Sequence, residues 1–126
     1  MEQFRLGEME QKFAELIWAQ APIASGQLAK LCGEAFDWKR TTTYTMLKRL
    51  CDRGIFANEG GTVVVRMEQA EFFAAQGEQL IDENFDGSLP QFLTAFSRRR
   101  KLSAREVEEL RRLIEEYEEE EDGRRN

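Results

Sequence analysis

The feature that most constrains the fold of this 126-residue chain is a change in hydrophobic spacing at Gly54. Before Gly54, apolar residues recur at the spacing of three successive amphipathic helices. After it, Ile55–Glu59 and Thr62–Arg66 are β-prone runs, and the intervening Gly60 and Gly61 accept the positive φ angles of a tight turn. Three helices followed by a β-hairpin form a winged helix-turn-helix. The sequence therefore predicts this domain over residues 1–67, with residues 55–66 as the wing.

Helix-breaking and capping residues set the expected bounds of the first two helices. The first is predicted over Leu6–Trp18, and Pro22 prevents its continuation because proline has no backbone N–H group. Ser25 is a suitable N-cap for the second helix, which is expected to reach Phe36.

The third helix, expected over residues 38–53, has two chemically different sides. We expect it to begin at Asp37 or Trp38 and to end at Gly54, which can adopt a left-handed cap. Its apolar side consists of Met46, Leu47, Leu50 and Cys51. Its polar side consists of Thr41, Thr42, Thr45, Lys48 and Arg49, with no acidic residue before Asp52. Arg and Lys reach phosphates and guanine, and Thr fits close to base edges, so this side suits a DNA major groove. An ordinary amphipathic surface helix is the alternative.

The rest of the chain carries helical signals alone. Two helices are predicted over Glu68–Phe85 and Leu89–Arg99. A third follows a capping box in which Ser103 and Glu106 satisfy each other's backbone donors. The expected fold is therefore mostly α-helical with a small β-hairpin, a winged helix-turn-helix followed by a three-helix region.

Each of these three helices has an apolar stripe, and together they would form a thin core alone. We therefore expect residues 68–120 to be a dimerisation domain that buries the stripes against a second copy, and a two-fold protein matches an inverted repeat in DNA. The alternative is that the helices pack back on the winged helix. The expected dimerisation residues are Phe72, Phe73, Leu80, Ile81, Phe85, Leu89, Phe92, Leu93, Phe96, Leu110, Leu113, Ile114 and Tyr117. Residues 121–126 are expected to form a disordered tail.

The charge is unevenly distributed along the chain. Its net value is −6, yet residues 1–67 hold nine Lys and Arg against eight Asp and Glu, and the acidic excess lies in residues 68–126. DNA binding depends on a local basic face, so the total does not exclude it. The acidic balance leaves a rival function open, a protein-interaction module that uses a winged-helix scaffold without specific DNA binding.

Several classes of protein are disfavoured by the composition. No window is apolar enough to span a membrane, and the N-terminus lacks the pattern of a signal peptide. Cys32 and Cys51 have no Cys-x-x-Cys spacing and suit reduced core thiols, which favours the cytoplasm. The chain has no histidine and no Gly-rich phosphate loop. We therefore expect no metal site, no cofactor and no enzymatic activity.

Three sets of residues together resemble a known family. The first helix matches with Leu6, Glu10, Phe13, Ile17 and Trp18. The centre matches with Trp38, Thr42, Thr45, Met46, Leu47, Arg49, Leu50 and Gly54. The C-terminal region matches with Gly87-Ser88, Phe96, Leu102-Ser103 and Glu108-Glu109-Leu110. In this order, over nearly the whole chain, they resemble the family of penicillinase repressors, methicillin-resistance repressors and copper-responsive operon repressors.

The resemblance implies a homodimeric winged-helix repressor that binds double-stranded operator DNA at an inverted repeat and blocks transcription. The implied contacts from the recognition helix are Thr41, Thr42, Thr45 and Arg49. The same helix adds Lys39, Arg40, Tyr44 and Lys48 by their position. In the wing, Gly61 and Arg66 stand near the family's basic and aromatic positions, so wing contacts are expected to differ, and Arg66 is included among the candidates.

Two regulatory mechanisms of the family meet departures in this chain. Antibiotic-responsive members are inactivated by a regulatory protease that cleaves an Asn-Phe bond, and the aligned pair here is Ala95-Phe96. Cleavage with the same specificity is therefore not expected. Copper-responsive members carry paired Cys-x-Cys motifs near the C-terminus, and no cysteine follows Cys51 in this sequence. Copper sensing by that route is excluded, and the inducing signal stays open.

Overall fold

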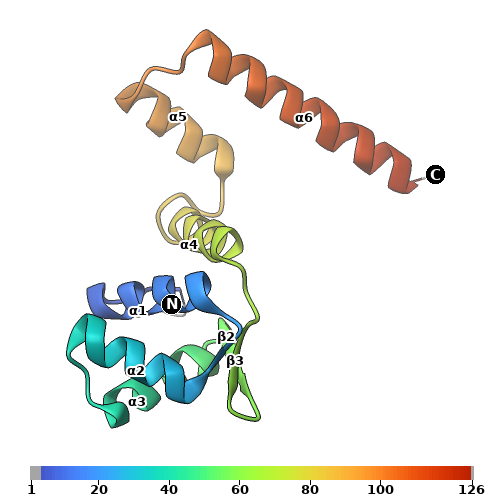
Figure 1. Ribbon diagram of the computed structural model, residues 1–126. Coiled ribbons are helices and arrows are strands. Elements are labelled where there is room, and N and C mark those ends of the chain that lie inside the picture. Colours follow the sequence, from blue (N-terminus) through green and yellow to red (C-terminus); the bar gives the residue numbers. More distant parts are fainter. Residues whose placement is uncertain (1–3, 126) are drawn as a thin grey trace. The chain divides into compact units, whose positions relative to one another are not determined.

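A computed structural model describes residues 4–125 and shows a mostly helical chain with one small sheet (Figure 1). In order, the elements are α1 (Glu8–Gln20), β1 (Ile23–Ala24), α2 (Ser25–Phe36), α3 (Arg40–Asp52), β2 (Phe56–Glu59), β3 (Thr62–Val65), α4 (Gln69–Asn84), α5 (Leu89–Arg99) and α6 (Ala104–Arg125). The chain divides after Asn84 into two compact units. The predicted fold class is confirmed: three helices and a hairpin, followed by helices. No helix in residues 4–125 is long and apolar enough to cross a membrane.

The hairpin forms as predicted, and it gains a third strand. Gly60 and Gly61 have φ angles of 60° and 92°, and they connect the antiparallel strands β2 and β3. The short strand β1 pairs antiparallel with β3, so the strand order is β1-β3-β2. The Ser25 N–H group, at the start of α2, donates to the Gly61 carbonyl over 2.8 Å. The wing is therefore bonded to the segment that leads into α2.

Several expected helix boundaries are wrong by one to three residues, and α1 covers Glu8–Gln20 instead of Leu6–Trp18. Ser25 is the first residue of α2 rather than its cap, because the N-cap is Ala24, whose backbone is extended where it pairs with Thr62 of β3. The third helix begins at Arg40, since Asp37 adopts a left-handed conformation with φ of 56° that interrupts helical geometry. At the other end of this helix, Gly54 has a φ of 83°, as the left-handed cap requires.

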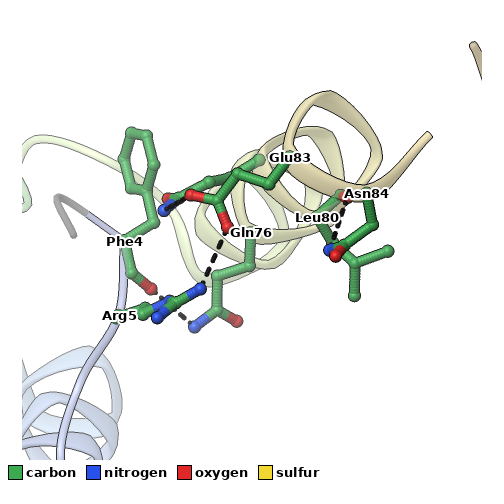
Figure 2. A pocket seen from close by; sticks show the side chains of 7 residues that line it. Phe4, Arg5, Gln76, Leu80, Glu83 and Asn84 are labelled. Carbon is green, nitrogen blue, oxygen red and sulfur yellow. Dashed lines mark hydrogen bonds and ion pairs between the residues drawn. The ribbon is translucent and has the colours of Figure 1, made fainter. Parts of the chain in front are cut away.

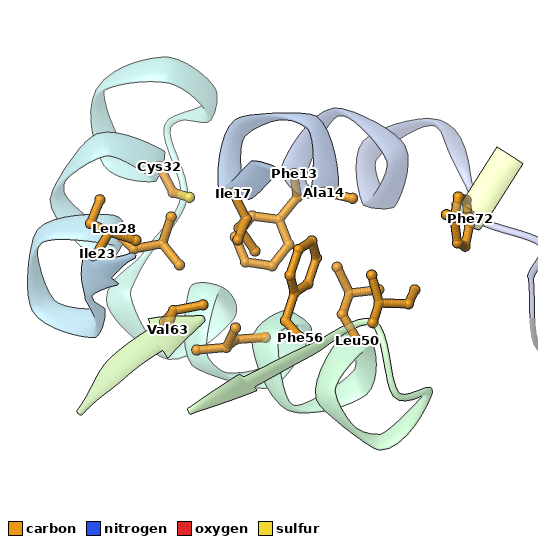
Figure 3. Close-up of a cluster of buried hydrophobic side chains, with 12 residues drawn as sticks. Phe13, Ala14, Ile17, Ile23, Leu28, Cys32, Leu50, Phe56, Val63 and Phe72 are labelled. Carbon is orange, nitrogen blue, oxygen red and sulfur yellow. The ribbon is translucent and has the colours of Figure 1, made fainter. Parts of the chain in front are cut away.

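One hydrophobic core joins the elements of the first unit (Figure 3). Phe13 and Ile17 of α1 are fully buried, as are Leu28 of α2 and Leu50 of α3. The sheet contributes Val63 from β3, together with Phe56 from β2. Because each side chain of this size gains about 1.5–3 kcal/mol from full burial, the core holds α3 rigidly against the rest of the unit.

The helix α4 belongs to this first unit. Phe72 is fully buried, with its ring 5.5 Å from that of Trp18 and 6.0 Å from that of Phe4. The Trp18 indole N–H also donates to the Met67 carbonyl over 2.9 Å, which fixes the chain just before α4. Phe72 was expected on a dimer surface, and that assignment is wrong for this conformation, because the aromatic cluster of the same chain encloses it.

The second unit, residues 85–125, has no fully buried residue among those the structure describes. Its helix starts follow the predicted caps: Ser88 Oγ accepts from the Gln91 N–H, and Ser103 and Glu106 bond to each other's backbone N–H groups. The helix α6 continues to Arg125, through residues expected to form a disordered tail. Glutamate and arginine are good helix formers, which favours this continuation.

Candidate nucleic-acid interface

The buried residues of α3 define which of its sides faces solvent. Thr43, Leu47 and Leu50 are buried in the unit. The polar residues predicted for DNA contact are all exposed, namely Lys39, Arg40, Thr41, Thr42, Thr45, Lys48 and Arg49, while Tyr44 is half-buried. The core therefore fixes the helix so that this polar side lies at the surface.

The cations of this surface differ in what surrounds them. Lys48 Nζ lies 3.0 Å from Asp52 Oδ2, one helical turn further along. Arg49 contacts the Met46 sulfur at 3.7 Å instead of an acid. Among residues 4–125, no ion pair joins Lys39, Arg40 or Arg49 to a carboxylate. Their charges are available to an anionic ligand, whereas that of Lys48 is partly compensated.

The threonines also fall into two groups. Thr45 Oγ1 donates to the Thr41 carbonyl over 2.9 Å, a local bond typical of Thr in helices. Its oxygen can still accept a hydrogen bond from a ligand. Within the described part of the chain, Thr41 and Thr42 have no side-chain hydrogen bond, so both hydroxyls can donate or accept.

The start of α3 meets the start of α2 through one arginine. Arg40 Nη2 donates to Tyr44 Oη over 3.3 Å, and its guanidinium lies 5.6 Å from the centre of the Tyr44 ring. A hydrogen bond from the Ser25 side chain lowers the pKa of Tyr44, with a smaller effect from Arg40 in the same direction and an opposing effect of desolvation. Ser25, Arg40 and Tyr44 thus form a polar cluster at one end of the exposed side.

The wing contributes Arg66, which we expected to contact DNA. Its Nη2 atom lies 3.6 Å from Glu59 Oε2, and both side chains are 58% exposed. A carboxylate this close competes with phosphate for the same cation. The structure thus places the Glu59 carboxylate beside the candidate contact of the wing, a neighbour that sequence spacing does not reveal.

Arg53, at the end of α3, serves the fold instead of the interface. Its Nη1 atom donates to the Arg5 carbonyl over 2.7 Å and lies 3.7 Å from Glu10 Oε2. Arg5 in turn pairs with Glu83 of α4 at 2.9 Å (Figure 2). The Gln76 amide donates to the Phe4 carbonyl beside a pocket of about 160 Å³. These contacts attach the segment before α1 to both α3 and α4.

Neither cysteine has the environment of a reactive thiol. Burial raises the pKa of Cys32, with a partly opposing effect of the Thr43 hydroxyl, and burial also raises that of Cys51. Both thiols are therefore protonated at neutral pH. Among residues 4–125 no group of three acidic, Cys or His side chains could hold a metal ion.

The residues expected to form a dimer lie on both units. Those exposed are Phe73, Leu80, Leu89, Leu93, Leu113, Ile114 and Tyr117, and those half-buried are Ile81, Phe85, Phe92, Phe96 and Leu110. In the second unit, a groove of about 420 Å³ lies between α5 and α6, and its apolar lining is Phe92, Leu93, Phe96, Leu102, Leu110 and Leu113.

Comparison with known proteins bears on the chain as a whole. The model of the family described as penicillinase repressor matches residues 6–116. The chain belongs to the penicillinase repressor family. It is 22% identical to the penicillinase repressor of Bacillus licheniformis over 117 residues, which cover 90% of this chain and 91% of that relative.

Membership of the penicillinase repressor family confirms the resemblance inferred from the sequence motifs. The match includes both units, from α1 into α6. It identifies the chain as a member of a repressor family rather than an enzyme. Fold and family therefore agree on a winged-helix regulator. The exposed side of α3 is the candidate nucleic-acid interface of this regulator.

Proposed function

We propose that the protein is a DNA-binding transcriptional repressor that binds an inverted-repeat operator in the cytoplasm as a homodimer. In each copy, α3 enters the major groove and the hairpin lies beside it as the wing. The observation that carries this proposal is the exposed side of α3, where Lys39, Arg40 and Arg49 have no carboxylate partner among residues 4–125. Uncompensated cations interleaved with exposed threonines suit phosphate and base contacts.

The proposed DNA-binding surface consists of nine residues. They are Lys39, Arg40, Thr41, Thr42, Tyr44, Thr45, Lys48, Arg49 and, from the wing, Arg66. Thr41 and Thr42, with free hydroxyls, and Arg49, with no acid beside it, are the strongest candidates for base reading.

The dimer is proposed to form through the second unit. Leu113 and Ile114 of α6 are 61% and 58% exposed, and Tyr117 one turn later is 62% exposed. A row of large apolar side chains at this exposure costs free energy in water, and a second copy can cover it. Two-fold pairing would present two copies of α3 to successive major grooves.

Release by a protease that requires Asn before Phe is not part of this proposal. The aligned bond, Ala95-Phe96, lies inside the helix α5, and the Arg100 guanidinium lies 4.8 Å from the Phe96 ring centre. A protease of other specificity would have to open this turn of helix before it could cleave.

Footprinting of the DNA upstream of the protein's own gene tests the proposal. We expect two protected half-sites related by two-fold symmetry, and binding that weakens as salt rises because phosphate contacts release counterions. Arg49→Ala should weaken binding by about 10- to 100-fold and reduce discrimination between operator and unrelated DNA. Arg105→Ala, which removes an exposed arginine of α6, is the matched control and should change neither property.

The rival, a protein-interaction module, makes the opposite prediction. If the wild-type dimer bound this DNA no better than an unrelated duplex of the same length, specific repression at this site would be excluded. A stoichiometric protein partner recovered without enrichment of DNA would then favour the rival.

A further inference from the structure

The side chain of Arg40 is held in place before any ligand binds. Its guanidinium lies against the Tyr44 ring, 5.6 Å from the ring centre, and Nη2 donates to Tyr44 Oη over 3.3 Å. Tyr44 follows Arg40 by four residues, so both lie on the same side of α3. The same guanidinium also approaches Gly26 in the first turn of α2, where a β-carbon would lie 3.2 Å from Arg40 Nη2. The guanidinium thus lies close to both an aromatic ring and a backbone position without a side chain.

This arrangement distinguishes Arg40 from three other arginines and lysines of the first unit. Lys48 pairs with Asp52, Arg53 with Glu10, and Arg66 with Glu59. Arg40 has no carboxylate partner among the described residues, so its positive charge is positioned but not neutralised. An arginine whose rotamer is already fixed loses less conformational entropy when it binds an anion.

The location of Arg40 indicates which part of DNA its guanidinium would contact. In helix-turn-helix proteins the recognition helix lies in the major groove, and the helix before it crosses the sugar-phosphate backbone. Arg40 is the first residue of α3, yet its guanidinium reaches back to the first turn of α2. Ser25 beside Gly26 is bonded through its N–H group to Gly61 of the wing, so this corner is fixed relative to the hairpin. A planar guanidinium here matches a backbone phosphate, which it can bind through two parallel hydrogen bonds.

We propose that Arg40 is a pre-positioned phosphate contact, and that Tyr44 and Gly26 act through it as positioning residues. This inference rests on the proposed DNA-binding function and assigns different roles in binding to different residues of α3. Arg40 sets affinity for any duplex, and the middle of α3 sets sequence preference. Tyr44, which belongs to the proposed DNA-binding surface, acts there by holding Arg40.

The test measures dissociation constants across a salt series, on the footprinted upstream duplex and on an unrelated duplex of the same length. We expect Arg40→Ala to weaken binding to both duplexes by the same factor, roughly 10-fold, and to reduce the salt slope by about 1. Tyr44→Phe keeps the ring and removes the hydroxyl, and Gly26→Ala adds a methyl group from which the guanidinium must shift slightly. Tyr44→Phe should weaken binding to both duplexes several-fold, and Gly26→Ala should weaken binding to both by a smaller factor.

Two controls separate positioning from a loss of structure or a direct contact. Gly77→Ala makes the same change at a helical glycine of α4 with nothing within 4 Å, and it should leave DNA binding unchanged. The melting temperature should not fall below that of the wild type in either Gly26→Ala or Tyr44→Phe, and alanine in place of the helical Gly26 can raise it. In an Arg40→Ala background, Tyr44→Phe and Gly26→Ala should have no further effect on binding.

Three results would contradict the proposal, and each would overturn a different part of it. If Tyr44→Phe weakened binding as much without Arg40 as with it, Tyr44 would contact DNA itself and the positioning role would be overturned. If Arg40→Ala affected the upstream duplex alone, Arg40 would read a base instead of a phosphate. If the wild type bound neither duplex, the proposed function would fail, and this inference with it.

Discussion

The two units of the chain bury their apolar side chains to very different extents. In the first, Phe13, Ile17, Leu28, Leu50 and Phe72 are completely enclosed within one chain. In the second, no described residue is fully buried, and Tyr117 is 62% exposed. A unit with its own core can fold alone, whereas helices that leave their apolar stripes in water depend on a second surface. The comparison supports the proposal that DNA contact belongs to the first unit and dimer assembly to the second.

The largest effect is expected when an aromatic ring is removed from the core of the first unit. Phe72→Ala should lower the free energy of unfolding by about 3–5 kcal/mol, because it leaves a cavity among Phe4, Trp18 and Phe73. Chemical denaturation measures this value. Phe73→Ala is the matched control, since that ring is 44% exposed, and it should cost less. A loss for Phe72→Ala that disappeared at high protein concentration would instead place Phe72 in a dimer interface.

The second unit should respond in the opposite way, in assembly and not in folding. Leu113→Glu places a charge in the exposed apolar row of α6, and loss of one buried leucine corresponds to about 1.5–3 kcal/mol. We therefore expect the dissociation constant of the dimer to rise roughly 10- to 100-fold in sedimentation equilibrium, with the core of the first unit intact. Arg112→Glu puts the same side chain on the neighbouring exposed position and should have a smaller effect. Equal effects would argue against a dimer surface at Leu113.

Charge provides a finer comparison between the units. Asp52→Asn releases Lys48, and Glu59→Gln releases Arg66, so each should strengthen binding to any duplex by a few-fold and increase its salt dependence. Glu109→Gln removes an equivalent exposed ion pair from α6, with Arg105, and should leave DNA affinity almost unchanged. Electrophoretic mobility shifts over a salt series measure all three. An equal gain from Glu109→Gln would show that net charge, rather than the surface of α3 and the wing, sets affinity.

The smallest expected effect concerns acid sensitivity of the second unit. A hydrogen bond from the Ser103 N–H group, followed by the charge of Arg100, lowers the pKa of Glu106. The carboxylate therefore stabilises the start of α6 at pH values above the usual glutamate pKa of about 4.3, and this contribution is lost as pH falls through the lower folded value. Glu106→Gln should reduce helicity slightly at neutral pH in circular dichroism. The difference from the wild type should vanish in strong acid, whereas Glu120→Gln should show none at either pH.

The parts of the fold that follow from local chemistry were predictable from the sequence. Hydrophobic spacing predicted the helices, the Gly60-Gly61 pair predicted the hairpin, and the capping box at Ser103 followed from side-chain chemistry. Strand β1 was not predicted, because two residues are too few to show a period of two. It also moved the helix start by one residue, since the strand keeps Ala24 extended and makes it the N-cap, with Ser25 as the first helical residue.

For the candidate site, the residue types were predictable, while their environments required the structure. A polar side on the third helix followed from spacing alone. The pairing of Arg66 with Glu59 depends on how the hairpin strands align. The approach of the Arg40 guanidinium to Gly26 depends on how α2 and α3 cross. An amphipathic stripe likewise shows that a helix buries one side but not what covers it. This is why Phe72 was assigned to a dimer surface although its own chain encloses it.

The bond between Ser25 and Gly61 has a consequence for how operators of different sequence would be accommodated. It joins the wing to α2, and the common core joins α2 to α3, so hairpin and recognition helix cannot swing independently. If α3 and the hairpin move as one rigid body, the spacing between these two proposed DNA-contacting elements cannot adjust to the duplex. Adjustment then falls to the DNA, and sequences that bend or change groove width at low energetic cost should be favoured even where no side chain touches them.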